Sequence, residues 1–224
     1  MFLYSTWGLM LLALVISGLA QIMVSSTYSK FAKVRSRQGI AACDAARRIL
    51  DYNGLTHVRI EQVRGNLTDH YDPRKKTLCL SESVHNSASV AALGVAAHEA
   101  GHAIQDQEGY VPLRIRGALV PVANIGSQLS WILVLFGMIL GYLGLIDIGI
   151  LLFSAVVLFQ LVTLPVEFNA SARALAALEG GGLLEADEAR QTKRVLSAAA
   201  LTYVAAVLVS LLQLARLLLL RNRR

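Results

Sequence analysis

Residues 125–165 read IGSQLSWILVLFGMILGYLGLIDIGILLFSAVVLFQLVTLP. This stretch contains two apolar runs, at 125–144 and 145–165, and each is long enough to cross the roughly 30 Å of hydrocarbon in a bilayer. The turn between them, at residues 144–147, contains no Lys or Arg. The stretch therefore predicts a pair of transmembrane helices joined by a short turn.

Two more apolar runs lie outward from this pair, at residues 3–24 and 198–220. The hydrophobic fraction of 55% and the mean hydropathy of +0.53 are too high for an ordinary soluble domain. We interpret the first run as an anchor and not as a cleaved signal peptide. No basic segment precedes it, it is longer than the usual run of about 7–15 apolar residues, and no small-residue cleavage site follows. We expect an integral membrane protein with four transmembrane helices.

The distribution of basic residues predicts the orientation of these helices. Four of them follow the first apolar run: Lys30, Lys33, Arg35 and Arg37. The positive-inside rule then places the N-terminus outside and residues 25–115 in the cytoplasm. Basic residues before the second and fourth runs agree, whereas the basic tail at 221–224 disagrees. The net charge of +6 does not indicate nucleic-acid binding, because no basic patch is interleaved with aromatic residues.

Upstream of the apolar pair, residues 97–103 read AHEAGHA and contain a His-Glu-x-x-His motif. On a helix, His98 and His102 project from one face with Cβ atoms about 5–6 Å apart, which suits two imidazoles on one zinc ion. Glu99 lies beside the first histidine, where a carboxylate can deprotonate a zinc-bound water. The alternative is a chance solvated face of His and Glu. Polar residues punctuate the helix expected from residue 87 or 89 to 107, so we do not expect it to face lipid.

The segment before this motif predicts a small α+β region. Residues 38–52 have helical periodicity and end at Asn53-Gly54, and residues 58–63 alternate like a half-buried strand. Two further short stretches, 67–71 and 77–80, flank a turn at 72–75. We expect a sheet of two or three strands, in which an edge strand near 77–80 would bind substrate by strand addition.

A catalytic zinc ion normally has three protein ligands and a water, so one ligand is missing from the motif. Several carboxylates lie on its predicted side of the membrane, together with three further histidines: His57, His70 and His85. Glu167 is the best placed candidate, because the chain crosses the membrane out and back between His102 and Glu167. A carboxylate beside a span end is costly unless it is paired or bound to metal. The alternative is an interfacial carboxylate, stabilised by the helix dipole after Pro165.

Several stretches resemble the YugP-like membrane zinc metallopeptidases: residues 68–73, 80–81, 89–105, 164–168 and 201–204. This resemblance implies a neutral zinc-dependent endopeptidase in a prokaryotic plasma membrane. Glu167 followed by Ala170-Ser171 is also similar to the Glu-x-x-Ala-Asp segment of HtpX-type and CAAX-prenyl endopeptidases, which implies that Glu167 is the third zinc ligand. Ser171 stands where those enzymes have Asp, and Asn169 stands where we expect Asp in YugP-like proteins. The group that orients a ligating histidine therefore stays open.

Four further residues are candidates for the site, and each also has a purely structural interpretation. His70 and Asp72 could supply a group near the metal or a substrate-binding edge, but we favour a turn in which Asp72 caps the bend before Pro73. Tyr203 could stabilise an oxyanion, although tyrosines are common interfacial anchors. Arg173 could orient the helix of Glu167 or bind a substrate carboxyl group, but we favour a simple cytoplasmic charge.

We therefore expect a mainly α integral membrane protein with four transmembrane helices and a small α+β cytoplasmic zincin-like domain. The expected segments are an anchor at 1–24, the metallopeptidase domain at 25–116, a transmembrane hairpin at 117–165, a cytoplasmic helical segment with the third ligand at 166–197, and a transmembrane helix with a basic tail at 198–224.

The expected function is zinc-dependent hydrolysis of peptide bonds at the cytoplasmic membrane surface, in processing or quality control of membrane proteins. Zn²⁺ is the expected cofactor, with His98, His102 and Glu167 as ligands and Glu99 as general base. The expected partners are the lipid bilayer, a peptide or protein substrate, and an oligomeric or regulatory membrane partner. The alternative of another class is a scaffold that holds zinc without turnover. An intramembrane protease is disfavoured, because the chain lacks the Leu-Asp-Gly and Asn-Pro-Asp-Gly settings that supply an Asp ligand in such enzymes.

Overall fold

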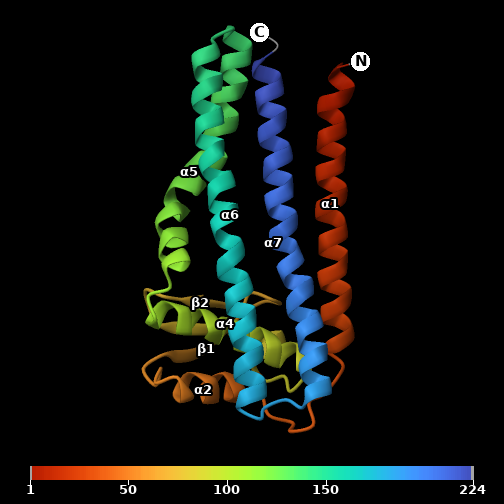
Figure 1. Ribbon diagram of the computed structural model, residues 1–224, viewed down its shortest axis with the longest axis vertical. Helices are drawn as coiled ribbons and strands as arrows, with labels where there is room; N and C mark the ends of the chain where they lie inside the picture. The colour runs from red at the N-terminus through yellow and green to blue at the C-terminus, as the bar shows by residue number, and fades with distance from the viewer. Residues whose placement is uncertain (1, 223–224) are drawn as a thin grey trace. The chain divides into compact units, whose positions relative to one another are not determined.

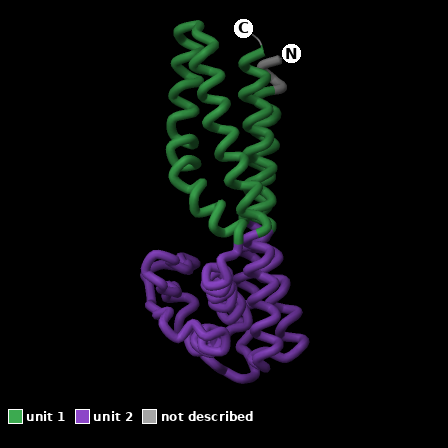
Figure 2. The backbone as a smooth tube through the Cα atoms, turned by 60° about the vertical axis from the view of Figure 1, so that its left-hand side comes forward, with its two compact units in different colours: residues 1–21, 111–165, 201–224 green, residues 22–110, 166–200 purple. Residues whose placement is uncertain are grey.

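The computed structural model describes residues 2–222 as seven helices and three short strands (Figure 1). In chain order the elements are α1 (Phe2–Phe31), α2 (Ala42–Tyr52), β1 (Arg59–Val63), β2 (His70–Asp72), β3 (Thr77–Ser81), α3 (Glu82–His85), α4 (Val90–Gln107), α5 (Val111–Leu140), α6 (Leu143–Gly180) and α7 (Ala186–Arg221). They form two compact units: unit 1 comprises residues 1–21, 111–165 and 201–224, and unit 2 comprises 22–110 and 166–200 (Figure 2).

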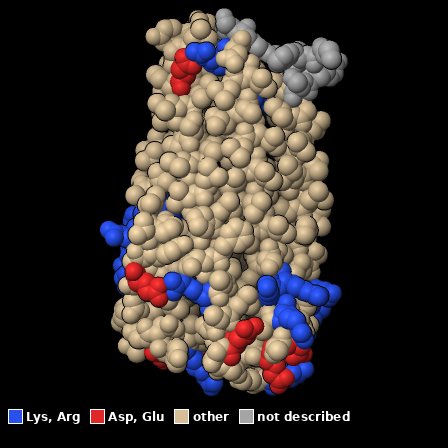
Figure 3. All heavy atoms as spheres, viewed as in Figure 1, with Lys and Arg blue, Asp and Glu red and all other residues tan. Residues whose placement is uncertain are grey.

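Four helices of the described chain are long and apolar enough to span a membrane, as the sequence predicts. They cover Thr6–Phe31, Val111–Leu140, Leu143–Gly180 and Ala186–Arg221. Charged side chains leave a broad band free on the face drawn in Figure 3. The protein is therefore a multi-pass membrane protein that is mainly α-helical.

The helices of unit 1 pack closely through small residues, as is common in membranes. A Cβ atom added at Gly126 of α5 would lie 2.7 Å from the carbonyl oxygen of Leu152 on α6. The turn between these helices falls at residues 141–142, earlier than the predicted turn at 144–147. Gly141 has a φ of 67°, a left-handed conformation that glycine adopts without strain, and this ends α5. Hydropathy alone does not locate such a break.

One cation of the basic tail has a partner within unit 1. The Arg221 Nε atom lies 3.0 Å from Oδ1 of Asp147, so the charge of Arg221 is balanced there. Arg223 and Arg224 lie outside the described residues. Arg221 still disagrees with the orientation predicted from the other basic residues, because the positive-inside rule counts Lys and Arg and is little affected by acidic neighbours.

The sheet of unit 2 has the strand order β1-β3-β2, and this confirms the small predicted sheet. β3 pairs in parallel with β1 and antiparallel with β2, so it is the central strand and all five of its residues are buried. The prediction of an edge strand near 77–80 is therefore wrong. The apolar run at 78–80 fits a strand covered on both sides, and the free edges belong to β1 and β2.

Unit 2 packs around α4, whose small residues let its neighbours approach closely. The buried core includes the alanine-rich face of α2, most of α4, and residues of α6 and α7. Arg37, in the segment after α1, links that segment to the N-terminal end of α7. Its backbone N–H donates to Glu188 at 2.7 Å, and its guanidinium pairs with Asp187 at 2.9 Å and with Glu185. Segments far apart in the sequence thus form one core around the helix of the His-Glu-x-x-His motif.

Candidate metal centre

α4 begins and ends with well-defined caps that fix the position of the motif. The Ser89 hydroxyl accepts a hydrogen bond from the backbone N–H of Ala92 at 3.2 Å, as an N-cap should. After the C-terminal end, Gly109 adopts a φ of 63°. Between the caps, His98 and His102 lie on one face, with ring centroids 4.8 Å apart in an edge-on arrangement. His102 is buried, whereas His98 and Glu99 are half-buried.

α6 brings Glu167 to these two histidines. Its Oε2 atom lies 3.2 Å from Nε2 of His98 and 3.7 Å from Nε2 of His102. The Glu167 side chain is only 2% exposed. Among the His, Cys, Asp and Glu side chains of residues 2–222, these three form the one group whose ligand atoms all lie within 4.8 Å of one another.

The distances from Glu167 to the two histidine nitrogens fit a shared zinc ion, and all three ligand atoms lie within 4.8 Å of one another. In a tetrahedral site with metal–ligand bonds of about 2.0–2.1 Å, ligand atoms lie roughly 3.3 Å apart, close to the two distances here. Two imidazoles and one carboxylate are also a ligand set of catalytic zinc sites, which keep a fourth position open. The residues present therefore fit the metal that the sequence predicts.

A close contact between α4 and α6 sets the distance between the motif and Glu167. A Cβ atom at Gly101 would lie 2.7 Å from the carbonyl oxygen of Ala170, which is nearer than non-bonded atoms come. Ala170 lies one helical turn after Glu167, on the same face of α6. The glycine between Glu99 and His102 therefore lets the helix of Glu167 reach the histidines.

The outer nitrogens of both histidines have uncharged partners. Nδ1 of His98 lies 3.1 Å from Oγ of Ser171, and Nδ1 of His102 lies 3.0 Å from Oε1 of Gln105. Both rings thus turn Nε2 towards Glu167. The Ser171 hydroxyl thus lies at the position where the sequence resemblance implies an Asp carboxylate. Sequence reasoning missed Gln105, and its position three residues after His102 on the same helix was the available signal.

The electrostatic environment of the site favours a cation. Burial acts to lower the pKa of His102, but the hydrogen bond to Glu167 and the negative charges of Glu99 and Glu167 outweigh it and raise that pKa. The same two carboxylates that favour a proton on the ring also favour a divalent metal ion beside it.

Glu99 is available for proton transfer. No side chain in the described part of the chain donates a hydrogen bond to its carboxylate, and the residue is half-buried next to His98. A carboxylate in this state can accept a proton from a water molecule held beside it. The arrangement can therefore hold a metal ion and supply an adjacent base.

The hairpin residues lie outside the metal cluster. Oδ1 of Asp72 accepts the backbone N–H groups of Arg74 at 2.9 Å and Lys75 at 3.2 Å, as in the turn-capping alternative. His70 is exposed, and its Nδ1 lies 2.9 Å from the carbonyl oxygen of Thr68. Neither side chain is bonded to the three candidate ligands, so a role in catalysis stays a prediction for both.

Asn169 and Arg173 lie close to the site, on α6. Oδ1 of Asn169 accepts hydrogen bonds from Nε2 of Gln105 at 2.9 Å and from Nε of Arg173 at 2.7 Å. Arg173 also forms a bidentate ion pair with Glu108, with N–O distances of 2.9 and 2.6 Å. Arg173 is thus a paired residue and not a free cytoplasmic charge. Tyr203 belongs to unit 1, and its proposed oxyanion role stays a prediction.

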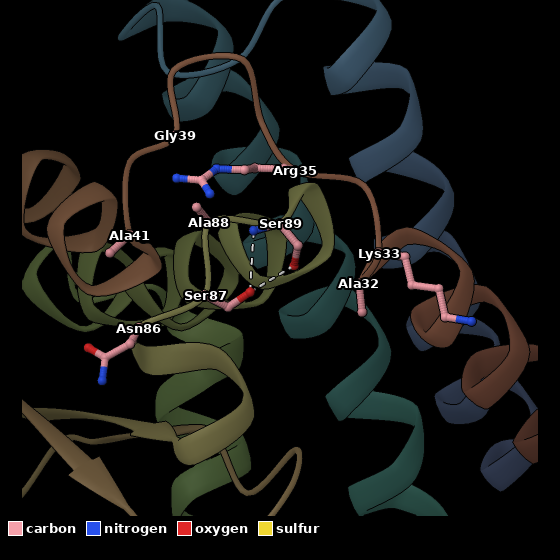
Figure 4. Close-up of a pocket in the computed structure, with 9 residues that line it drawn as sticks. All are labelled: Ala32, Lys33, Arg35, Gly39, Ala41, Asn86, Ser87, Ala88 and Ser89. Carbon is pink, nitrogen blue, oxygen red and sulfur yellow. Dashed lines mark hydrogen bonds between the residues drawn. The ribbon is translucent and has the colours of Figure 1, made fainter.

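A separate pocket of about 280 Å³ borders the N-terminal end of α4. In Figure 4 the Arg35 guanidinium reaches between Gly39 and Ala88, while the Ser87 and Ser89 hydroxyls bond to each other at 3.1 Å. Ser89 is already used as the helix cap, and no candidate metal ligand lines this pocket. The pocket is therefore distinct from the metal centre.

Comparison with known proteins agrees with this site. The family model described as "putative neutral zinc metallopeptidase" matches residues 6–222. The chain is 52% identical over 204 residues to the "Putative membrane protease YugP" of Bacillus subtilis (strain 168), an alignment that covers 91% of each chain. No solved structure matches the chain. With a match over nearly its whole length, the chain belongs to this family of neutral zinc metallopeptidases.

Proposed function

We propose that this protein is a zinc-dependent endopeptidase that cleaves peptide bonds at the cytoplasmic surface of the membrane. The observation that carries the proposal is the convergence of Nε2 of His98, Nε2 of His102 and Oε2 of Glu167, with the free carboxylate of Glu99 beside them. Membership of the family supports the same reaction. Processing or quality control of membrane proteins is the role we expect for such an activity.

The residues divide the work between binding and proton transfer. His98, His102 and Glu167 would hold the ion, and the bound zinc would polarise a substrate carbonyl and lower the pKa of a water molecule towards about 7. Glu99 accepts the proton of the attacking water and returns it to the leaving amine, as a general base and then a general acid. The low exposure of Glu167 and His102 limits competing water at the site.

We place the substrate along the free edge of β2. This strand is attached to α4, because the Tyr71 hydroxyl donates a 2.8 Å hydrogen bond to Oδ2 of Asp106. Asp106 lies one turn after His102 on α4. An extended peptide that pairs with the outer edge of β2 would gain main-chain hydrogen bonds, whatever its sequence. This edge replaces the one at 77–80, which β1 and β2 cover.

The cytoplasmic orientation of the site rests on the basic residues at and just after the C-terminal end of α1. Lys30, Lys33, Arg35 and Arg37 precede the metal motif without an intervening apolar run. Cytoplasmic segments next to membrane spans are enriched in such residues. The proposal therefore assigns unit 2 to the cytoplasm.

The catalytic role is tested with Glu99→Gln in full-length protein purified in detergent. The variant should bind zinc like the wild type but hydrolyse casein about 10²–10⁴-fold more slowly, because it lacks the base. Glu82→Gln, a neutralised glutamate on the exposed surface of the same unit, is the matched control and should be unaffected. Removal of zinc with a chelator should abolish the activity, and added zinc should restore it. Proteolysis that survives metal removal would contradict the proposal.

A scaffold that holds zinc without turnover is the competing function. It predicts that the wild type and Glu99→Gln bind zinc equally and that both are inert towards casein and towards membrane-protein substrates. The free, half-buried carboxylate of Glu99 favours the enzyme, since a purely structural site has no use for an unbonded base.

A further inference from the structure

Gln105 is a fully buried amide next to the metal centre, at 0% exposure. A buried amide is costly unless its oxygen and both its hydrogens are bonded. Here Oε1 lies 3.0 Å from Nδ1 of His102, and Nε2 donates to the carbonyl oxygen of Val166 at 2.9 Å and to Oδ1 of Asn169 at 2.9 Å. Each polar atom of the side chain therefore has a partner on α4 or α6.

The orientation of this amide is fixed from its far end. Arg173 can only donate hydrogen bonds, so the Asn169 atom that faces Nε of Arg173 at 2.7 Å must be the oxygen Oδ1. That oxygen needs a donor from Gln105, which places Nε2 there and leaves Oε1 towards His102. Glu108, the residue at the C-terminal end of α4, holds Arg173 through two contacts at 2.9 and 2.6 Å.

The direction of these hydrogen bonds then determines which ring nitrogen of His102 carries the hydrogen. Oε1 of Gln105 can only accept a hydrogen bond, so Nδ1 of His102 must carry a hydrogen and donate it to Oε1. In the neutral ring, Nε2 therefore has a free lone pair, and Nε2 is the atom that faces Glu167. The Ser171 hydroxyl beside His98 can donate or accept, so it does not impose the same constraint there.

We infer that Gln105 is a positioning residue for the metal centre, and that Arg173 fixes its orientation through Asn169. The inference rests on the proposed metal site and deepens it. A hydrogen-bonded chain runs from Glu108 at the end of α4, through Arg173 and Asn169 on α6, to Gln105 and His102. The same chain joins the two helices that supply the ligands, so it fixes both the tautomer of His102 and the relative position of the helices. Asn169 can serve where Asp is expected, because either side chain presents an oxygen acceptor to Arg173 and Gln105.

The test is the zinc affinity of full-length protein in detergent, measured by competition with a chromogenic chelator. Gln105→Leu should weaken zinc binding about 10–100-fold, as loss of a hydrogen-bond partner of a metal-ligating histidine typically does. Asn169→Leu should also weaken it, whereas Asn169→Asp, which keeps the acceptor, should bind like the wild type. Arg173→Met should weaken binding less than Gln105→Leu, because the amides can then reorient but remain present.

A matched control separates positioning from general stability. Thr192→Val removes a buried hydrogen bond from α7 to α4, the 3.1 Å contact from Oγ1 to the carbonyl oxygen of Val90, without touching a histidine. It should lower thermal stability and leave zinc affinity unchanged. The ligand-field absorption of bound Co²⁺ should change in Gln105→Leu and stay the same in Thr192→Val and Asn169→Asp.

Two results would overturn the inference: wild-type zinc affinity in Gln105→Leu, or an equal loss in Thr192→Val. If Gln105→Leu does not fold, the Asn169 pair decides, and equal affinities of Asn169→Leu and Asn169→Asp would refute it. These outcomes differ from failure of the proposed function. A wild-type protein that binds no zinc contradicts the metal site itself, whereas normal wild-type binding with an unaffected Gln105→Leu contradicts only the role of Gln105.

Discussion

At the scale of single residues, two carboxylates are enough to balance the charge of a divalent ion at the candidate metal centre. Glu99 and Glu167 provide two negative charges, which match those of a divalent ion, and the partners of both histidines are uncharged. A carboxylate partner would add negative charge and make the histidine ligand more basic. The serine and glutamine partners orient the rings without that charge. In the proposed mechanism, the two carboxylates at the site are thus left for metal binding and for proton transfer.

Glu167→Gln should bind zinc much more weakly than the wild type, because it replaces a charged ligand with a neutral one. The loss should exceed the roughly 10–100-fold that removal of a neighbouring partner costs. Glu179→Gln, an exposed residue on the same helix, is the control and should not change affinity. The measurement is chelator competition. Equal affinities of the two variants would show that the third ligand lies elsewhere.

The sequence predicts the ligands better than it predicts their supports. His98, Glu99 and His102 form a motif with helical spacing in a single segment. The two apolar runs between His102 and Glu167 predict that Glu167 lies on the same side of the membrane as the motif. Gln105 and Arg173 act across the contact between α4 and α6, which forms only in the folded chain. The sequence offers Arg173 as a candidate and places Gln105 three residues after His102, but no local pattern encodes the contact through which the two residues act.

At the scale of elements, the contact between α4 and α6 decides whether a site forms. The two helices meet at Gly101 and Ala170, where only a glycine allows the approach. The sheet shows what the sequence does not predict at this scale. The sequence predicts its strands, but their order depends on pairing between distant segments, and so β3 became the central strand and not an edge.

Gly101→Ala should separate α4 from α6 and move Glu167 away from the histidines. The added methyl group would lie 2.7 Å from a backbone oxygen that cannot rotate away, and overpacking of this kind costs about 1–3 kcal/mol of stability. We expect lower thermal stability together with weaker zinc binding.

Gly94→Ala on the same helix is the matched control for Gly101→Ala. Its Cβ would meet Cγ2 of Thr192 on α7 at 2.7 Å, a contact that does not involve α6. This variant should change stability and leave zinc affinity as it is. Parallel losses of zinc affinity in both variants would argue against a specific role for the contact at Ala170.

At the scale of the whole molecule, each compact unit is assembled from segments distant in sequence. α6 contributes residues 143–165 to unit 1 and residues 166–180 to unit 2. Glu167 therefore belongs to the same unit as the motif, although 64 residues lie between His102 and Glu167 along the chain. Hydropathy predicts the four apolar helices, but it does not predict that the ends of three of them, α1, α6 and α7, complete the core around α4.

The orientation in the membrane is tested with single cysteines in a background that lacks Cys43 and Cys79. Arg64→Cys in unit 2 and Tyr142→Cys at the turn between α5 and α6 are both exposed positions. A membrane-impermeant thiol reagent should label Arg64→Cys only from the cytoplasmic face and Tyr142→Cys only from the opposite face, as the positive-inside rule predicts. The reverse pattern in inverted and right-side-out vesicles would place the site outside the cytoplasm.

The proposed site requires one zinc ion between His98, His102 and Glu167. Anomalous diffraction at the zinc absorption edge, from crystals of the full-length protein grown with zinc, tests it most directly. We predict one strong peak about 2.0–2.2 Å from Nε2 of both histidines and from a carboxylate oxygen of Glu167. Bound zinc with its peak at any other position would contradict the account.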